Sequence, residues 1–251
     1  MNLWRLELLR IVRTRRWLAL LSVYVVFGLL GPVTAKYLPE ILKAAGGNAS
    51  GVTITFPDPV PADGFVQYVS NAVQVGTIVA VVVAAGALAF DAIPEMGVFL
   101  RTRVASLWQI LVPRLVVSFV AAALAFVLGT ATTWYETWAL LGPVATDRAL
   151  VGTALGVLFL ALVVALVAAV AQWMRGVLPT VMTSLVILVV FPIVGVIPAL
   201  GAWMPSRLGS ALADVVQNGV PGDAWKPSVV AIAAIGGLIW FAGRGAARRE
   251  A

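Results

Sequence analysis

Very few side chains in this sequence could make or break covalent bonds. The 251 residues include no cysteine and no histidine, which excludes a thiol nucleophile, a disulfide framework and an imidazole metal ligand or proton shuttle. The phosphate-binding pattern G-x-x-x-x-G-K-[ST], the zinc pattern H-E-x-x-H and the serine-hydrolase pattern G-x-S-x-G are all missing. We therefore expect no catalytic residue, no metal site and no cofactor on this chain.

Side chains that could line a path through a membrane are concentrated near the start of a long apolar stretch. Gln67, Ser70, Asn71 and Gln74 recur at i, i+3, i+4 and i+7, so a helix places all four on one face. Thr77 follows one turn further along that face. The spacing fits the wall of a polar cavity, a candidate translocation path. It is also typical of hydrogen bonding between membrane helices, which we favour because that use is more common.

A second feature is an apolar segment that is interrupted by prolines. Pro192 and Pro198 exclude one straight helix through residues 191–204. Irregular backbone at membrane depth must be buried in protein or line a cavity, so Pro192, Ile197, Pro198 and Trp203 form a candidate outer gate. A kinked helix end followed by a surface loop explains the same pattern equally well.

Six long, continuously apolar stretches must position these side chains. Each is close to or above the roughly 17–25 residues that a helix needs to cross the hydrocarbon of a bilayer, and the alternation typical of a membrane β-barrel is absent. The chain is 61% hydrophobic and 11% charged, with a mean hydropathy of +1.01. The stretches are Trp17–Val33, Phe65–Phe90, Ile110–Thr133, Leu150–Trp173, Leu178–Leu200 and Pro227–Ala242.

The basic residues indicate how these stretches are oriented. Twelve of the 17, all of them arginines, fall in segments on one side, whereas the other side holds only Lys36, Lys43, Arg148, Arg207 and Lys226. By the positive-inside rule, the arginine-rich side is cytoplasmic and holds both termini. The net charge of +6 therefore faces anionic lipid headgroups, and we expect no nucleic-acid partner.

The fold class predicted from these patterns is all-α: a polytopic integral membrane protein with six transmembrane helices and both termini in the cytoplasm. Residues 1–16 combine leucines and arginines at helical spacing. They predict an N-terminal amphipathic interfacial helix with its arginines toward lipid headgroups, or equally a plain basic flank. The expected divisions are a transmembrane domain at 17–244, outer loops at about 35–64, 134–149 and 201–226, a cytoplasmic loop at about 91–112 and a basic tail at 245–251.

The cytoplasmic loop between the second and third stretches carries the most specific pattern: an acid, a glycine, an apolar turn, and an apolar entry into the next span with a basic residue. These residues are Glu95, Gly97, Phe99-Leu100, Ser106–Leu111 and Arg114. With the basic N-terminal helix and the proline-broken fifth stretch, the pattern resembles the type-2 ABC transporter permeases, the membrane subunits of bacterial ATP-driven exporters. The chain departs from that family at Pro94 and at Leu107, where a basic residue is common.

The resemblance implies partners. Permeases of this family work in pairs, alike or different, with two separate ABC ATPase subunits that bind ATP and Mg²⁺. It places the chain in the inner (plasma) membrane of a bacterium and makes the first cytoplasmic loop the coupling element. The mainly aliphatic and aromatic spans favour an amphipathic or lipophilic cargo, such as a drug, peptide or lipid-like compound. The implied ATPase-coupling residues are Asp91, Glu95, Gly97, Phe99, Arg101 and Arg103.

Two other classes of protein fit the same residues. A membrane scaffold could anchor a cytoplasmic complex through the same loop without transporting anything. A membrane-embedded lipid-modifying enzyme would need acids near the outer face, and Glu136 and Asp147 are the only plausible ones. An ABC ATPase gene beside the gene for this chain would favour the permease.

Overall fold

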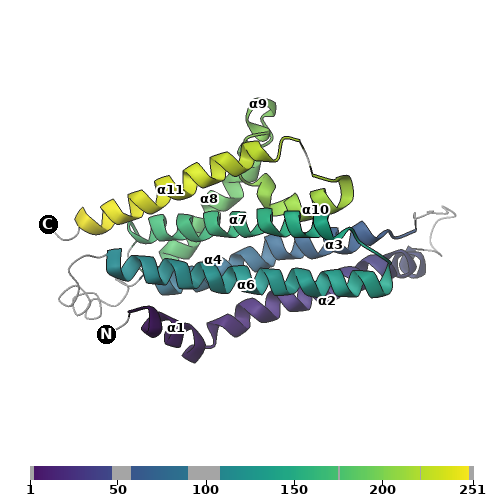
Figure 1. The fold of residues 1–251 in the computed structure, drawn as a ribbon, viewed down its shortest axis with the longest axis horizontal. Helices are drawn as coiled ribbons and strands as arrows, with labels where there is room; N and C mark the ends of the chain where they lie inside the picture. The colour runs from purple at the N-terminus through teal and green to yellow at the C-terminus, as the bar shows by residue number, and fades with distance from the viewer. Residues whose placement is uncertain (1–2, 47–57, 90–107, 175, 221, 249–251) are drawn as a thin grey trace.

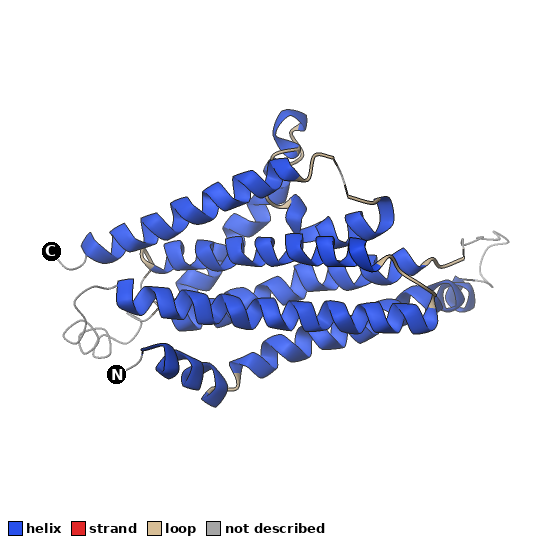
Figure 2. Ribbon diagram, in the orientation of Figure 1, coloured by secondary structure: helices blue, strands red, loops and turns tan. Residues whose placement is uncertain are grey.

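Helices make up nearly all of the computed structural model of the protein, which describes residues 3–46, 58–89, 108–174, 176–220 and 222–248. Figure 2 shows no strand in those residues, so the predicted all-α class is confirmed for them. The elements are α1 (Leu3–Arg13), α2 (Arg16–Gly46), α3 (Pro61–Asn71), the π-helical turn η1 (Ala72–Gly76), α4 (Thr77–Leu88), α6 (Trp108–Leu140), α7 (Thr146–Ala171), α8 (Val177–Val194), α9 (Pro198–Gly201), α10 (Arg207–Asn218) and α11 (Trp225–Arg248).

Six of the described helical segments are long and apolar enough to cross a membrane. They are α2, the continuous run α3–η1–α4, α6, α7, α8 and α11. At about 1.5 Å per residue, even the 18 residues of α8 extend for about 27 Å, close to the ~30 Å of a hydrocarbon core. The chain therefore has the make-up of a multi-pass membrane protein, as predicted.

The fourth span, α7, forms the centre of the bundle. In its most apolar window 72% of the residues are buried, against 17% for α8 and 22% for α11. α7 packs against α4, α6, α8, α10 and α11, and Figure 1 shows it between α6 and α11. A helix that is apolar on every side belongs in an interior, so α7 is the scaffold against which the other spans are placed.

Small residues let α2 and α6 cross closely. A Cβ atom added to Gly28 of α2 would lie 2.6 Å from the carbonyl oxygen of Gly129 of α6, and one added to Gly129 would lie 2.6 Å from the carbonyl oxygen of Tyr24. Any side chain at either position would collide with backbone atoms. Close backbone contact through small residues is a common way for membrane helices to associate.

Helices extend into segments that were predicted to be outer loops. α2 continues through Pro32 and Pro39 to Gly46, and α6 runs on to Leu140. A proline removes its own N–H and crowds one preceding carbonyl, but neighbouring helices can hold such a membrane helix together. Here Pro32 packs closely on Gly64 of α3, so a neighbouring helix lies against α2 at this proline.

The fifth span ends earlier than predicted and leads into an amphipathic helix. α8 ends at Val194, two residues after Pro192, and the short α9 leads by a turn to α10. The apolar side of α10 is buried against α7 and α3. A Cβ atom added to Gly152 of α7 would lie 2.7 Å from Cα of Leu212. Figure 1 shows α10 toward the end of the bundle opposite α1.

Both ends of the chain lie at one end of the bundle, where Figure 1 shows α1 and the last turns of α11. A sharp turn at Thr14 and Arg15 joins α1 to α2, and Arg15 has a left-handed φ of 53°. This turn folds α1 back against α6. The shared end agrees with the prediction that both termini lie on the same side of the membrane; that this side is cytoplasmic stays a prediction.

Candidate functional site

The predicted coupling element falls between α4 and α6 in the sequence, and Figure 1 shows the end of α4 and the start of α6 at the end of the bundle where α1 lies. Its expected contact residues all fall in the segment 90–107, outside the described residues. They are Asp91, Glu95, Gly97, Phe99, Arg101 and Arg103. The structure describes the base of this segment, which consists of the last turn of α4, the first turns of α6 and the α1 helix beside them.

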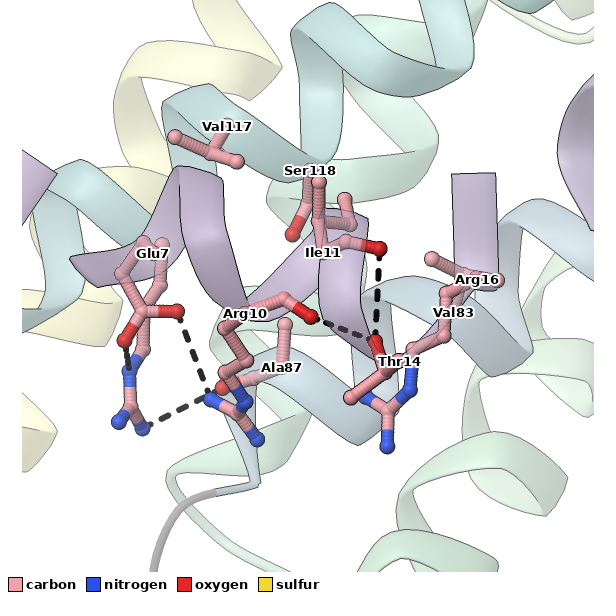
Figure 3. A pocket seen from close by; sticks show the side chains of 10 residues that line it. Glu7, Arg10, Ile11, Thr14, Arg16, Val83, Ala87, Val117 and Ser118 are labelled. Carbon is pink, nitrogen blue, oxygen red and sulfur yellow. Dashed lines mark hydrogen bonds and ion pairs between the residues drawn. The ribbon is translucent and has the colours of Figure 1, made fainter. Parts of the chain in front are cut away.

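A charged cluster joins these three elements. The Glu7 carboxylate of α1 accepts a hydrogen bond from Arg114 Nε of α6 over 2.8 Å, and its second oxygen lies 3.5 Å from Arg10 Nη1. Arg10 Nη2 donates to the Gly86 carbonyl over 2.9 Å, and Arg114 Nη1 donates to the Ala87 carbonyl over 3.3 Å. Figure 3 shows Glu7 and Arg10 side by side, with Ala87 of α4 next to them.

The two carbonyls are groups that a helix end leaves without partners. Gly86 and Ala87 lie in the last turn of α4, which ends at Leu88, and the last four C=O groups of an α-helix have no intrahelical donor. The guanidinium groups of Arg10 and Arg114 supply the missing donors. Their positive charge also complements the negative end of the α4 dipole, so α1 and α6 together cap α4.

The Glu7–Arg114 pair is largely removed from solvent. The Glu7 side chain is 14% exposed and the Arg114 side chain is 7% exposed. Removing one partner of a buried ion pair costs about 3–5 kcal/mol, because the other charge stays buried alone. An exposed pair contributes only about 0–1 kcal/mol. The pair therefore joins α1 to the entry of the third span through a contact that is mostly shielded from water.

The side chains around the cluster enclose only a small cavity. Its volume is about 10 Å³, and its lining includes Thr14, Val83, Val117 and Ser118 (Figure 3). That volume is at the lower limit for a single water molecule. We therefore interpret the cluster as a packed joint between helices and not as a ligand site.

The sequence patterns did not predict this contact, although two signals for it are present. They placed the arginines of residues 1–16 toward lipid headgroups and left Arg114 as a lone charge near the start of the third span. Glu7 is the only acid before Glu40, and Arg114 is the only charge in the stretch Ile110–Thr133. An acid and a base that are each isolated among apolar residues of a membrane protein tend to pair with one another.

The polar stripe of the second span is only partly covered by the rest of the chain. Ser70 and Gln74 are exposed, and Gln67 and Asn71 are half-buried. Within the described residues, the one side-chain hydrogen bond of these four is local, from Asn71 Nδ2 to the Gln67 carbonyl over 2.9 Å. Hydrogen bonding between helices, the interpretation favoured from the sequence, thus has no example there. The stripe is available to line a path or to meet another subunit.

A π-helical turn changes the exposed face of the helix at the end of the stripe. η1 covers Ala72–Gly76. A π turn holds more residues than an α turn, so the side chains that follow are rotated from their α-helical positions. Thr77, predicted on the face of the stripe, is instead buried, with 7% exposure, and that prediction was wrong. Single π turns are frequent at functional sites in helices.

The candidate outer gate is a true break in the helix and carries exposed apolar side chains. Pro192 lies in the last turn of α8 and Pro198 begins α9, so the backbone is not one straight helix. Ile197 is 50% exposed, and the ring of Trp203, 42% exposed, meets that of Trp225 edge-on at 5.6 Å. Apolar surface of this kind has to be covered by lipid or by another subunit.

The described residues offer little for catalysis. No group of three or more metal-ligating side chains occurs among them. Glu136 lies near the end of α6 and Asp147 in the first turn of α7. Neither acid has a described ion pair or side-chain hydrogen bond. The lipid-modifying enzyme stays an alternative.

Comparison of the chain with models of protein families, with curated protein sequences and with solved structures gave no match. Its function has to be inferred from its own residues and geometry.

Proposed function

We propose that the chain is the permease subunit of an ATP-driven exporter of the type-2 ABC kind, in the inner membrane of a bacterium. The observation that carries the proposal is the charged cluster of Glu7, Arg10 and Arg114. This cluster ties α1 to both helix ends from which the segment 90–107 extends. A segment that transmits motion from a soluble partner requires a firmly joined base of this kind.

In this proposal, ATP and Mg²⁺ bind to separate ATPase subunits, and closure of those subunits displaces the segment that carries Glu95, Arg101 and Arg103. α4 and α6 continue the chain on either side of it, so the displacement moves the second and third spans. Because Arg10 holds the end of α4 and Arg114 holds α1, the three helices move as one unit. The displacement of the coupling segment is then transmitted to the membrane-spanning parts of these helices.

The translocation path would lie between two permease subunits. One wall of the path would carry the polar side chains of the stripe, Gln67, Ser70, Asn71 and Gln74. The exposed apolar residues after Pro192 would close its outer end. Within the described part of the chain, neither of these two surfaces is fully covered by other residues. A path with few polar points suits an amphipathic or lipophilic cargo, such as a drug, peptide or lipid-like compound.

ATP hydrolysis by the purified complex tests this proposal. The chain is extracted from its native membrane in mild detergent, and the proteins bound to it are identified by mass spectrometry. We expect an ABC ATPase whose hydrolysis rate depends on the permease. The double variant Glu95→Ala with Arg101→Ala should lower that rate severalfold, since it removes two contacts of the coupling segment, while the chain remains inserted and monodisperse.

A matched control removes one acid and one arginine elsewhere. Arg5 and Glu40 are both exposed, so Arg5→Ala with Glu40→Ala should leave hydrolysis unchanged. Normal ATPase binding and hydrolysis in the Glu95→Ala, Arg101→Ala variant would remove the segment from the coupling role. Recovery of a cytoplasmic complex that contains no ATPase would point to the scaffold instead.

A further inference from the structure

A cavity of about 640 Å³ is lined by residues of α7, α10 and α11, and Figure 1 shows α10 toward the end of the bundle opposite α1. Its volume is within the roughly 300–1,000 Å³ that is usual for small-molecule sites. One wall is the face of α10 that carries Arg207, Ala211, Asp214 and Asn218 at helical spacing. None of the predicted path, gate or coupling residues lines this cavity, so it is a separate site.

The lining of the cavity is divided into an apolar part and a polar part. The apolar part includes Leu155 of α7 with Leu208 and Val215 of α10, and the polar part includes Arg207, Asp214 and Asn218. Leu155, Leu208 and Val215 are half-buried or buried, whereas Arg207 and Asn218 are exposed. A ligand with an apolar tail and a polar head has the same division. The cavity therefore has the chemistry of an amphiphile site.

A pair of tryptophans lies beside Ala224, one of the residues that line the cavity. Trp203, one turn before α10, meets Trp225, the first residue of α11, edge-on with ring centroids 5.6 Å apart. Tryptophans gather at the boundary between hydrocarbon and water, and Ala224, next to Trp225, lines the cavity. An outer-leaflet lipid with its head at this level can place the start of its acyl chains against Leu155.

The polar part presents charges of both signs that have no partner of opposite charge among the described residues. Asp223 is paired with Lys226 at 2.9 Å. Asp214 accepts a hydrogen bond from Ser210 Oγ over 2.9 Å but has no described ion pair, and neither has Arg207. Arg207 and Asp214 lie on one face of α10, about 10 Å apart along its axis, and the long Arg207 side chain can shorten that separation.

We propose that this cavity binds the headgroup of a zwitterionic phospholipid of the outer leaflet, with its phosphate at Arg207 and its ammonium group at Asp214. A guanidinium fork matches the geometry of a phosphate, and a carboxylate is an acceptor for an ammonium group. An anionic phospholipid offers a phosphate but no cation, so Asp214 would stay unpaired. This site goes beyond the proposed exporter function and does not depend on coupling to an ATPase.

Lipid retention, measured by native mass spectrometry, tests the site. The full-length chain is purified, delipidated in mild detergent and given either phosphatidylethanolamine or phosphatidylglycerol with identical acyl chains. We expect one tightly held phosphatidylethanolamine per chain, with an affinity about tenfold above that for phosphatidylglycerol, because a hydrogen bond between charged groups is worth at least that factor.

Two variants separate the headgroup contacts. Asp214→Asn preserves the shape of the side chain and should lower phosphatidylethanolamine affinity about tenfold without weakening phosphatidylglycerol, since only the ammonium group loses its partner. Arg207→Gln should weaken both lipids. Asp147→Asn and Lys36→Gln make similar charge changes at positions that do not line the cavity and should leave both affinities unchanged.

A third variant tests occupancy of the cavity without changing charge. Ala224→Phe adds a ring to the lining of the cavity and should weaken both lipids, even if a charge variant fails to fold. Equal retention of the two lipids by the unaltered chain would overturn the zwitterionic assignment. Normal phosphatidylethanolamine binding by Asp214→Asn would overturn it as well, and normal binding of both lipids by Ala224→Phe would show that they bind elsewhere.

Discussion

Among single residues, Arg114 makes two described contacts that a substitution would remove. Its guanidinium uses Nε on the Glu7 carboxylate and Nη1 on the Ala87 carbonyl. Alanine at this position would remove both donors and leave Glu7 with only its longer contact to Arg10, at 3.5 Å. Lysine would keep the charge, but its single ammonium group lacks the planar fork of donors that reaches two acceptors at once. The two contacts of Arg114 therefore require the donor geometry of arginine as well as its positive charge.

We expect Glu7→Gln and Arg114→Gln each to lower the stability of the folded chain by about 1.5–3 kcal/mol, because each removes the hydrogen bond between the two charged groups. The double variant should lose less than the sum of the two, since both substitutions remove the same interaction. Thermal unfolding of the full chain in detergent, followed by circular dichroism, measures all three.

Arg13→Gln is the matched control for these variants. Arg13 is exposed at the end of α1, so its substitution should change stability by no more than about 0.5 kcal/mol. If the losses from Glu7→Gln and Arg114→Gln simply add in the double variant, the two residues act independently and the ion pair does not hold α1 in place.

Among the helices, the crossing of α2 and α6 depends on the missing side chain of Gly129. A methyl group there would lie 2.6 Å from the Tyr24 carbonyl oxygen, a backbone atom that cannot move aside unless α2 shifts. We expect Gly129→Ala to lower stability by about 1–3 kcal/mol, the usual cost of overpacking. The melting temperature of the chain in detergent checks this expectation.

A glycine in α11 provides the control for Gly129. A Cβ atom added to Gly236 meets nothing within 4 Å, so Gly236→Ala should be neutral or stabilise the chain by up to about 1 kcal/mol through its better helix propensity. Equal melting temperatures for the two alanine variants would show that α2 and α6 do not cross through direct backbone contact.

The helices could be predicted from the sequence more fully than their ends. Apolar windows of about 20 residues leave a membrane chain few alternatives to a helix, and all six windows are helical. By contrast, α10 was predicted as part of a loop, although Leu208, Leu212 and Val215 recur at the i, i+4, i+7 spacing of an amphipathic helix. That spacing could have predicted the helix, but it does not identify the surface that buries it, which belongs to α7 and α3.

In the candidate sites too, the features set by local spacing could be predicted from the sequence, and those set by the fold could not. The shared face of Gln67, Ser70 and Asn71 follows from helical spacing alone, but no local pattern predicts the π turn that buries Thr77. Glu7 and Arg114 are 107 residues apart in the chain. Their types predict that each needs a partner, but only the folded arrangement of α1, α4 and α6 shows which partner each has.

For the whole molecule, α1 and the end of α11 share one end of the bundle (Figure 1), and its arginines predict that this end is cytoplasmic. The chain has no native cysteine, so single introduced cysteines report topology without background. Asp147→Cys and Asp223→Cys should react with a membrane-impermeant maleimide added to intact cells, and Arg13→Cys only after permeabilisation. Labelling of Arg13→Cys in intact cells would reverse the predicted orientation.

If the chain is a permease subunit as proposed, the exposed apolar residues at the end of α8 are where we expect two subunits to meet. Ile193 is 63% exposed, Val196 is 79% exposed and Ile197 is 50% exposed, and α8 is the least buried of the six spans. These residues surround a break in the helix, and irregular backbone at membrane depth is stable only against protein or a cavity. A plain lipid-facing helix has no need of such a break, so a second subunit is the cover that we expect.

If two copies of this chain pair through that surface, Ile197→Cys should form a disulfide-linked dimer when native membranes are mildly oxidised in the absence of ATP. Val229→Cys is the matched control, because Val229 is equally apolar and 53% exposed on α11 but is not part of the break. A spin label at Ile197 should also show low collision rates with lipid-soluble oxygen, whichever permease is the partner. High oxygen accessibility there, with no cross-link, would show that the segment faces lipid as an ordinary kinked helix end and that the subunits meet on another face.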